Sequence, residues 1–180
     1  MFVNCKKGHF GQAPAGECGI HPPDLVAGRA ITLAAAVAAA LMLGGQARPA
    51  TPSGAELSLL RVMNEVRAAH GLAPLRLDPR LQRSARGHSL AMLQSGSFTH
   101  GSFAARIRGT GVRAPHVGEN IAWGSGSYAR ARAIVNTWLA SPMHRANLLR
   151  SGYWIVGVGA LRGRFDGRTA LMVTTDFAGR

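Results

Sequence analysis

Cysteine is nearly absent from this sequence, because Cys5 and Cys18 are the only two and both lie before residue 20. A disulfide framework is therefore excluded for the rest of the chain, which must be stabilised by a hydrophobic core. Lysine is equally scarce. Lys6 and Lys7 are the only two, so the folded part of the chain carries its positive charge as arginine.

Acidic residues are also few, with 8 against 21 lysines and arginines and a formal net charge of +13. Residues 51–180 hold 17 arginines and six acids, so this part alone carries +11. Such a charge favours anionic partners, for example an envelope polymer or lipid head groups. The arginines are scattered rather than gathered in one stripe, so no nucleic acid is expected as a partner. A general compositional preference for arginine is the other interpretation of the charge.

An uninterrupted apolar run, AITLAAAVAAALML, occupies residues 30–43 and follows Arg29. It suits the hydrophobic region of a signal peptide and is short of the roughly 20 residues of a membrane span. Gly45 and Ala47 supply the small residues of a cleavage site. We therefore predict a protein that is secreted or held in the cell envelope, without a stable membrane span in its mature form. The predicted parts are a leader over 1–47, a linker over 48–55 and one domain over 56–180.

The apolar pattern of the domain predicts a mixture of helices and strands. Helical spacing begins at Leu59 and stops before Gly71, and Asp78 followed by Pro79 is typical of a helix start. Residues 95–127 are glycine-rich and are expected to form a long loop with one short strand over 117–123. The other expected elements are helices over 128–140 and 142–149 and strands over 153–161 and 169–177. Helices beside a small, mainly antiparallel sheet make an α+β layer fold.

Six short segments occur in an order that makes the sequence recognisable. They are NEVR at 64–67, SFTH at 97–100, GENI at 118–121, SPMHRANLL at 141–149, GVG at 157–159 and TTDF at 174–177. Together they resemble the cysteine-free bacterial branch of the CAP (SCP-like) superfamily, over about residues 57–178. The resemblance implies a three-layer α-β-α sandwich with a central cavity that often accepts a divalent metal.

The resemblance also assigns the candidate site residues. His100 matches the first histidine of the family, Glu119 the glutamate of the GEN motif, and His144 the second histidine. These three are the predicted catalytic and metal-ligating residues, and a divalent metal such as zinc is the implied cofactor. The alternative is a buried hydrogen-bonded His-Glu-His network that holds the glycine-rich loop in place without performing chemistry.

One family position is different in this chain. Many eukaryotic members have a second glutamate three residues after a helical tryptophan, whereas here Ser141 follows Trp138. Ser141 is expected to cap the next helix, with its hydroxyl accepting a backbone N–H. His144 then lies at the third helical position, where the helix dipole favours the neutral ring. Asn147, one turn later, is expected to orient that ring or a loop carbonyl.

Two functions fit these residues. The main prediction is a secreted binding module whose cleft and basic surface hold a ligand of the envelope or the extracellular medium. The alternative is a hydrolase in which a metal on His100, Glu119 and His144 activates water. The family's second acid is missing, so no general base separate from the ligands is evident, and two carboxylates arranged for glycoside hydrolysis are absent near the motif. His88 falls on the core-facing stripe of its helix and is interpreted as a structural histidine.

Overall fold

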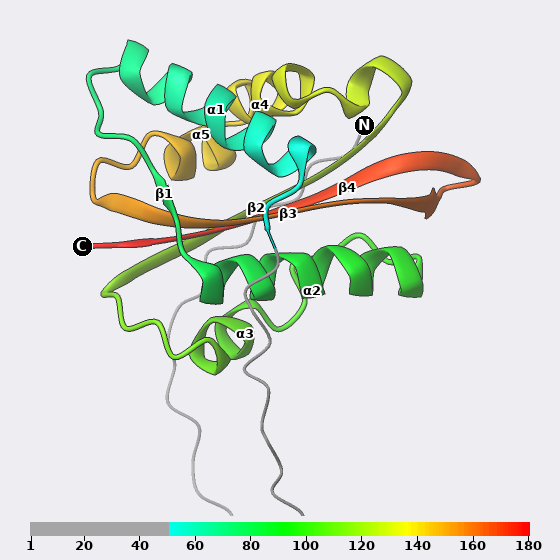
Figure 1. The fold of residues 1–180 in the computed structure, drawn as a ribbon, viewed down its shortest axis with the longest axis horizontal. Coiled ribbons are helices and arrows are strands. Elements are labelled where there is room, and N and C mark those ends of the chain that lie inside the picture. The colour runs from blue at the N-terminus through cyan, green and yellow to red at the C-terminus, as the bar shows by residue number, and fades with distance from the viewer. Residues whose placement is uncertain (1–50) are drawn as a thin grey trace, which may run out of the picture. The chain divides into compact units, whose positions relative to one another are not determined.

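Four strands form one sheet through the middle of the domain in the computed structural model, which describes residues 51–180 (Figure 1). The helices α1, α4 and α5 cover one face of the sheet, and α2 and α3 cover the other. The elements are α1 (Gly54–Ala69), β1 (Arg76–Leu77), α2 (Pro79–Ser95), α3 (Phe103–Gly109), β2 (His116–Ser125), η1 (Gly126–Ala129), α4 (Ala131–Ala140), α5 (Pro142–Leu148), β3 (Tyr153–Phe165) and β4 (Arg168–Gly179).

The predicted leader, its cleavage site and the apolar run 30–43 lie outside the described residues. The first helix, α1, begins within the predicted linker at Gly54. Ser53 and Glu56 start it by a reciprocal capping box, in which each side chain accepts the other residue's backbone N–H. In residues 51–180 we find no helix that is both long and apolar enough to span a membrane.

The second helix, α2, begins as the sequence predicts. The Asp78 side chain accepts the backbone N–H groups of Arg80 and Leu81, and Pro79 is the first helical residue. The helix ends at Gly96, which has a φ of 65°. Such a left-handed conformation favours glycine and stops the helix here.

The segment 95–127 is more regular than predicted. The short helix α3 lies within it, and β2 is longer than the strand expected at 117–123. The interpretation of most of this segment as a loop was wrong, because α3 has seven residues and buries only Ile107, which is too short a pattern for periodicity to detect.

The sheet has the strand order β1-β3-β4-β2. β3 and β4 form an antiparallel hairpin, and β2 pairs antiparallel with β4. The hairpin turn consists of Asp166 and Gly167, which both have positive φ and so match the twist of the strands. Only the short β1 is parallel to its neighbour β3, so the sheet is mainly antiparallel, as predicted.

Hydrophobic side chains fill both spaces between the layers. The larger cluster lies between the sheet and α1, α4 and α5, and it includes Trp138, which is fully buried. On the other face, α2 packs directly on the backbone of β3. A Cβ atom at Gly157 or Gly159 would come closer than 3.0 Å to the backbone of Leu81 or Ala85. The GVG segment therefore sets how closely α2 approaches the sheet.

Candidate functional site

Two buried carboxyl groups lie side by side on neighbouring strands, on the face of the sheet that α2 covers. Glu119 on β2 pairs in register with Asp176 on β4, and their exposed fractions are 4% and 0%. Residues in register on neighbouring antiparallel strands present their side chains on the same face. The expectation that no second acid accompanies the site residues was therefore wrong, because strand pairing brings Asp176 to Glu119 from far along the chain.

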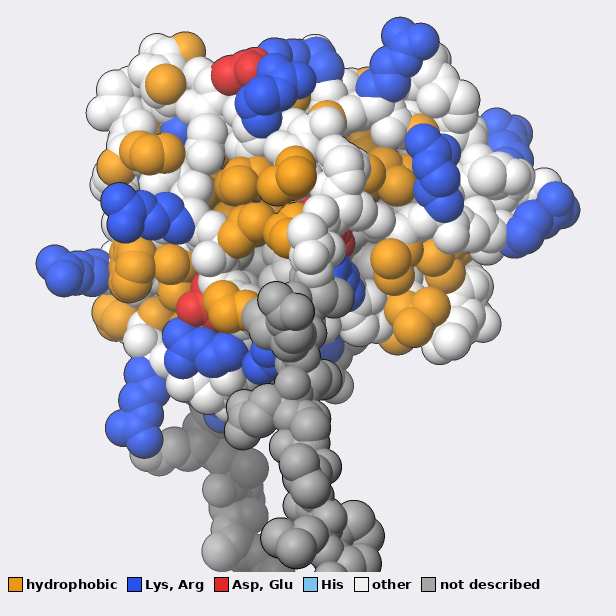
Figure 2. Space-filling view, viewed as in Figure 1, with side chains coloured by type: hydrophobic (Ala, Val, Ile, Leu, Met, Phe, Trp, Pro, Cys, Tyr) orange, Lys and Arg blue, Asp and Glu red, His pale blue; other side chains and the backbone are white. Residues whose placement is uncertain are grey.

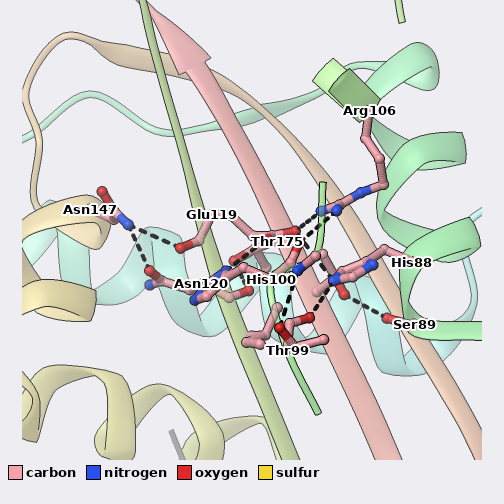
Figure 3. A network of polar contacts seen from close by, with 12 residues as sticks. His88, Ser89, Thr99, His100, Arg106, Glu119, Asn120, Asn147 and Thr175 are labelled. Atoms are coloured by element: carbon pink, nitrogen blue, oxygen red, sulfur yellow. Dashed lines mark hydrogen bonds and ion pairs between the residues drawn. The ribbon is translucent and has the colours of Figure 1, made fainter. Parts of the chain in front are cut away.

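Glu119 is the centre of a polar network (Figure 3). Its Oε1 atom lies 2.6 Å from Nδ1 of His100, and its Oε2 atom pairs with the guanidinium of Arg106. The same guanidinium donates to the backbone carbonyl of His100 at 2.7 Å. Arg106 therefore holds both members of the His100–Glu119 pair, and it does so from α3, the helix that the sequence did not predict.

His88 is buried as predicted, but it also belongs to this network. Its Nε2 atom lies 2.9 Å from the carbonyl oxygen of Thr99 and 3.9 Å from Oε2 of Glu119. Burial lowers the pKa of His88, and the opposing effect of Glu119 is smaller, so the neutral ring is favoured near neutral pH. Since Thr99 precedes His100, His88 connects α2 to the segment that presents the predicted site histidine.

Asp176 has an unusual environment for an acid. Neither of its carboxyl oxygens makes a hydrogen bond of ordinary geometry among the described residues, although the Ser84 hydroxyl and the Glu119 carboxyl group are close enough to influence it. Burial, and after it the neighbouring Glu119 carboxylate, raise the pKa of Asp176 well above its ordinary value. The protonated acid is therefore favoured at Asp176, whereas Glu119 is paired with Arg106.

This pKa shift predicts how stability depends on pH. Between the unfolded and folded pKa values of Asp176, the folded state keeps a proton that the unfolded state releases. The free energy of unfolding should therefore fall as pH rises, by up to about 1.4 kcal/mol per pH unit. Asp176→Asn should remove this contribution. Urea unfolding of both proteins between about pH 4 and about pH 8 measures the difference in slope.

Comparing wild type with Asp176→Asn is needed because other titratable groups change the free energy of unfolding with pH in the opposite direction. Glu56 and His88 have lowered pKa values in the folded state, so their contributions are lost as pH falls. Both remain in the variant and cancel in the difference. Asp166→Asn, at the exposed hairpin turn, is the control for loss of one carboxyl group. Equal slopes for wild type and Asp176→Asn would contradict a raised pKa.

The next residue of β2, Asn120, points to the opposite face of the sheet, towards α5. Its side chain donates to the carbonyl oxygen of His144 at 3.0 Å. Asn147 donates to the carbonyl oxygen of Glu119 at 3.1 Å and to Oδ1 of Asn120 at 3.0 Å. Figure 3 shows Asn147 on one side of β2, with His88 and Arg106 on the other. Asn147 therefore holds a carbonyl group of strand β2, rather than the loop carbonyl that the sequence suggested.

Gly118, the first residue of the GEN motif, allows this approach of α5. A Cβ atom at Gly118 would lie 2.8 Å from Oδ1 of Asn147 and under 3.0 Å from the Tyr153 hydroxyl. Only glycine leaves room for both groups. Each residue of the motif thus has its own role. Gly118 permits the close approach of α5, Glu119 is the centre of the carboxyl network, and Asn120 connects β2 to α5.

Ser141 and His144 interact in a way that the sequence did not predict. His144 is the third residue of α5, as expected, and it is buried. The Ser141 hydroxyl makes no capping bond, however, and lies 2.7 Å from Nδ1 of His144. The predicted capping role was wrong, because the ring competes with the backbone for this hydroxyl. Ser141 instead orients the histidine.

The motifs of this site occur together in known proteins. The model of the CAP family, the cysteine-rich secretory protein family, matches residues 60–177. The chain belongs to the CAP family.

Two curated relatives of this CAP domain come from Bacillus subtilis (strain 168). The uncharacterized membrane protein YlbC is 38% identical over 112 residues, which cover 59% of this chain and 32% of YlbC. The uncharacterized protein YkwD is 32% identical over 116 residues, which cover 62% of this chain and 44% of YkwD. The matched region therefore spans less than half the length of either relative.

Solved structures confirm the predicted α+β fold, a three-layer α-β-α CAP sandwich. An extracellular protein containing an SCP domain from Bacillus anthracis str. Ames has a TM-score of 0.60 and 28% identity, over 71% of this chain and 41% of that chain. An outer surface protein from Borrelia burgdorferi has a TM-score of 0.57 and 22% identity, over 68% of this chain and 90% of that chain. The second likeness concerns the fold alone.

The arrangement of donors in this CAP domain does not fit the zinc site that the sequence implies. Within residues 51–180, no group of three or more His, Cys, Asp or Glu side chains is placed to hold a metal ion. Both oxygens of Glu119 are engaged, and the Arg106 guanidinium beside them repels a divalent cation. Metal ligation by His100, Glu119 and His144 stays a prediction, and it would require Arg106 to leave Glu119.

Proposed function

We propose that this CAP domain is an extracytoplasmic binding module that holds an anionic ligand of the cell envelope or the extracellular medium. The observation that supports this function concerns the surroundings of its acidic residues. Most of them are paired with arginines or buried. The pairs are Glu56 with Arg86, Glu65 with Arg61 and Arg132, Asp78 with Arg80, and Glu119 with Arg106.

Asp176 is buried and favours its neutral form, which leaves only Asp166 at the hairpin turn as an acid without an ion pair among the described residues. The acids therefore do little to offset the remaining arginines at the surface. Figure 2 shows arginine side chains spread over the visible face, with only isolated acidic ones. A surface of this kind attracts anions at long range and accelerates their association.

An extracytoplasmic location is supported by two observations. The sequence predicts a signal peptide, and two similar proteins are described as a membrane protein and an extracellular protein. Envelope polymers and lipid head groups carry the negative charge that this surface would recognise. The proposal requires no metal ion.

Hydrolysis at the buried Glu119 network is the second candidate, and the Glu119–Asp176 pair favours it. Two neighbouring carboxyl groups can act as an acid and a base when one of them is protonated, and the raised pKa of Asp176 favours its protonated form. Both groups are buried, however, so a substrate could reach them only after the surrounding side chains moved. Binding therefore ranks before catalysis.

The proposed function predicts salt-sensitive binding. The purified protein should sediment with an insoluble bacterial envelope fraction, and the bound fraction should fall severalfold between about 0.05 M and about 0.5 M salt, because screening shortens the range of surface charges. Neutral phosphatidylcholine vesicles are the control and should bind little at either salt concentration. Absence of envelope binding at low salt, or binding that salt does not change, would contradict the proposal.

A further inference from the structure

A pocket of about 390 Å³ lies between α2 and the end of α3, on the outer side of the Glu119 network. Its volume is within the range of small-molecule sites. Arginines dominate its charged lining, and no acid lines it. The lining residues are Arg80, Arg83, Ser84, Gly87, His88, Ala91, Arg106, Gly109 and Thr110.

The three arginines of this pocket differ in their partners. Arg80 pairs with Asp78, and Arg106 pairs with Glu119, so two of the three charges are balanced from behind the pocket wall. Arg83 is exposed and has no ion pair or hydrogen bond among the described residues. The pocket thus has one uncompensated positive charge, at Arg83, flanked by two further guanidinium groups.

Two glycines leave the pocket open. A Cβ atom at Gly87 or Gly109 would meet nothing within 4 Å. Nε of Arg106, another lining residue, is buried without a hydrogen-bond partner among the described residues. Buried donors in native proteins are nearly always paired, so Nε of Arg106 has unused capacity to donate.

We infer that this pocket between α2 and α3 binds a phosphate group, together with the glycerol or sugar unit attached to it. A tetrahedral phosphate presents oxygens in several directions, so it can accept from Arg83 while its other oxygens face the remaining lining residues, whereas a carboxylate has only two oxygens. The planar arginine fork also matches phosphate geometry. No acid lines the pocket, so the ligand itself supplies the compensating charge.

This inference rests on the proposed function and specifies the ligand's chemistry. Phosphate diesters occur both in soluble envelope polymers and in lipid head groups. The first probe is therefore a soluble poly(glycerol phosphate) oligomer, titrated calorimetrically into the full chain. The second is a vesicle containing phosphatidylglycerol. Binding of the oligomer indicates a polymer as the source, and binding of vesicles alone indicates a membrane.

Three variants test the site with either probe. Arg83→Gln removes the uncompensated charge and should weaken binding at least about tenfold. Gly87→Leu fills the pocket without changing its charge and should have a similar effect. Arg164→Gln makes the same charge change on an exposed residue of β3, away from the pocket, and should change affinity less than about twofold.

The outcomes separate this site from the proposed function. Equal effects of Arg83→Gln and Arg164→Gln, with no effect of Gly87→Leu, would show that phosphate binds by general surface charge and would overturn the pocket. Failure of both phosphate probes, while salt-sensitive envelope binding persists, would overturn the pocket and leave the proposed function standing. If the wild-type protein does not bind the envelope fraction at all, the proposed function itself is refuted.

Discussion

An Arg67→Met variant is expected to lose about 4 kcal/mol of unfolding free energy, a large part of the 5–15 kcal/mol typical of a native protein. Arg67 is fully buried in α1, and its guanidinium donates to four backbone carbonyl groups at 2.9–3.0 Å. These carbonyls belong to Ala73, Leu148, Arg150 and Tyr153.

The magnitude follows from the carbonyl groups that the variant leaves behind. Each buried acceptor without a donor costs about 1–3 kcal/mol. Burial lowers the pKa of Arg67, which shows that its charge is partly desolvated, and removing the arginine recovers that penalty. The net loss is therefore smaller than the sum of four bonds. Arg67→Lys should recover only part of it, because one ammonium group cannot reach carbonyls in several directions.

Urea unfolding followed by tryptophan fluorescence measures the effect. Arg61→Met on the same helix is the matched control, since Arg61 is exposed and its pair with Glu65 is a surface ion pair. It should change stability by less than about 1 kcal/mol. Similar unfolding midpoints for the two variants would show that the buried arginine is not needed to hold α1, α5 and β3 together.

Gly157→Ala should also be severely destabilising, by about 3 kcal/mol or more. The added Cβ atom would overlap the carbonyl group of Leu81, which is backbone within α2 and cannot rotate away. Either α2 or β3 must move, and overpacking in a well-packed interior typically costs about 1–3 kcal/mol even when only side chains shift. Because α2 carries His88, the same movement should disturb the Glu119 network.

Gly87→Ala provides a control with the opposite sign. Gly87 lies in the middle of the same helix, and a Cβ atom there meets nothing within 4 Å. Alanine in a helix interior is favoured over glycine by about 0.5–1 kcal/mol. Thermal unfolding should therefore give a lowered midpoint for Gly157→Ala and a slightly raised one for Gly87→Ala. A shift in the same direction for both would contradict the proposed contact between α2 and β3.

The main elements of the fold were predictable because their signals are local. The capping residues of α2, the apolar faces of α1 and α4, and the β3–β4 hairpin are all encoded within short windows of sequence. β1 was missed because two residues carry no periodicity. α3 was missed because its single buried residue gives no pattern.

The site was only partly predictable, because half of its members depend on pairings between distant segments. His100 and Glu119 were found through their motifs, and the structure joins them directly. Asp176 lies within the TTDF segment, but only the strand register places it opposite Glu119. Arg106 lies in a segment expected to be a loop. No local signal in the sequence could show that its charge is directed at Glu119.

The alternation of Glu119 and Asn120 along β2 makes this strand intolerant of insertions and deletions. A shift of one residue would exchange the faces, placing a carboxylate against α5 and an amide among His100 and Arg106. The same shift would bring a side chain into the space that Gly118 leaves for Asn147. The number of residues in β2 is therefore as constrained as their type. The exposed turn at Asp166 and Gly167, by contrast, can accept insertions or deletions without altering either helical layer.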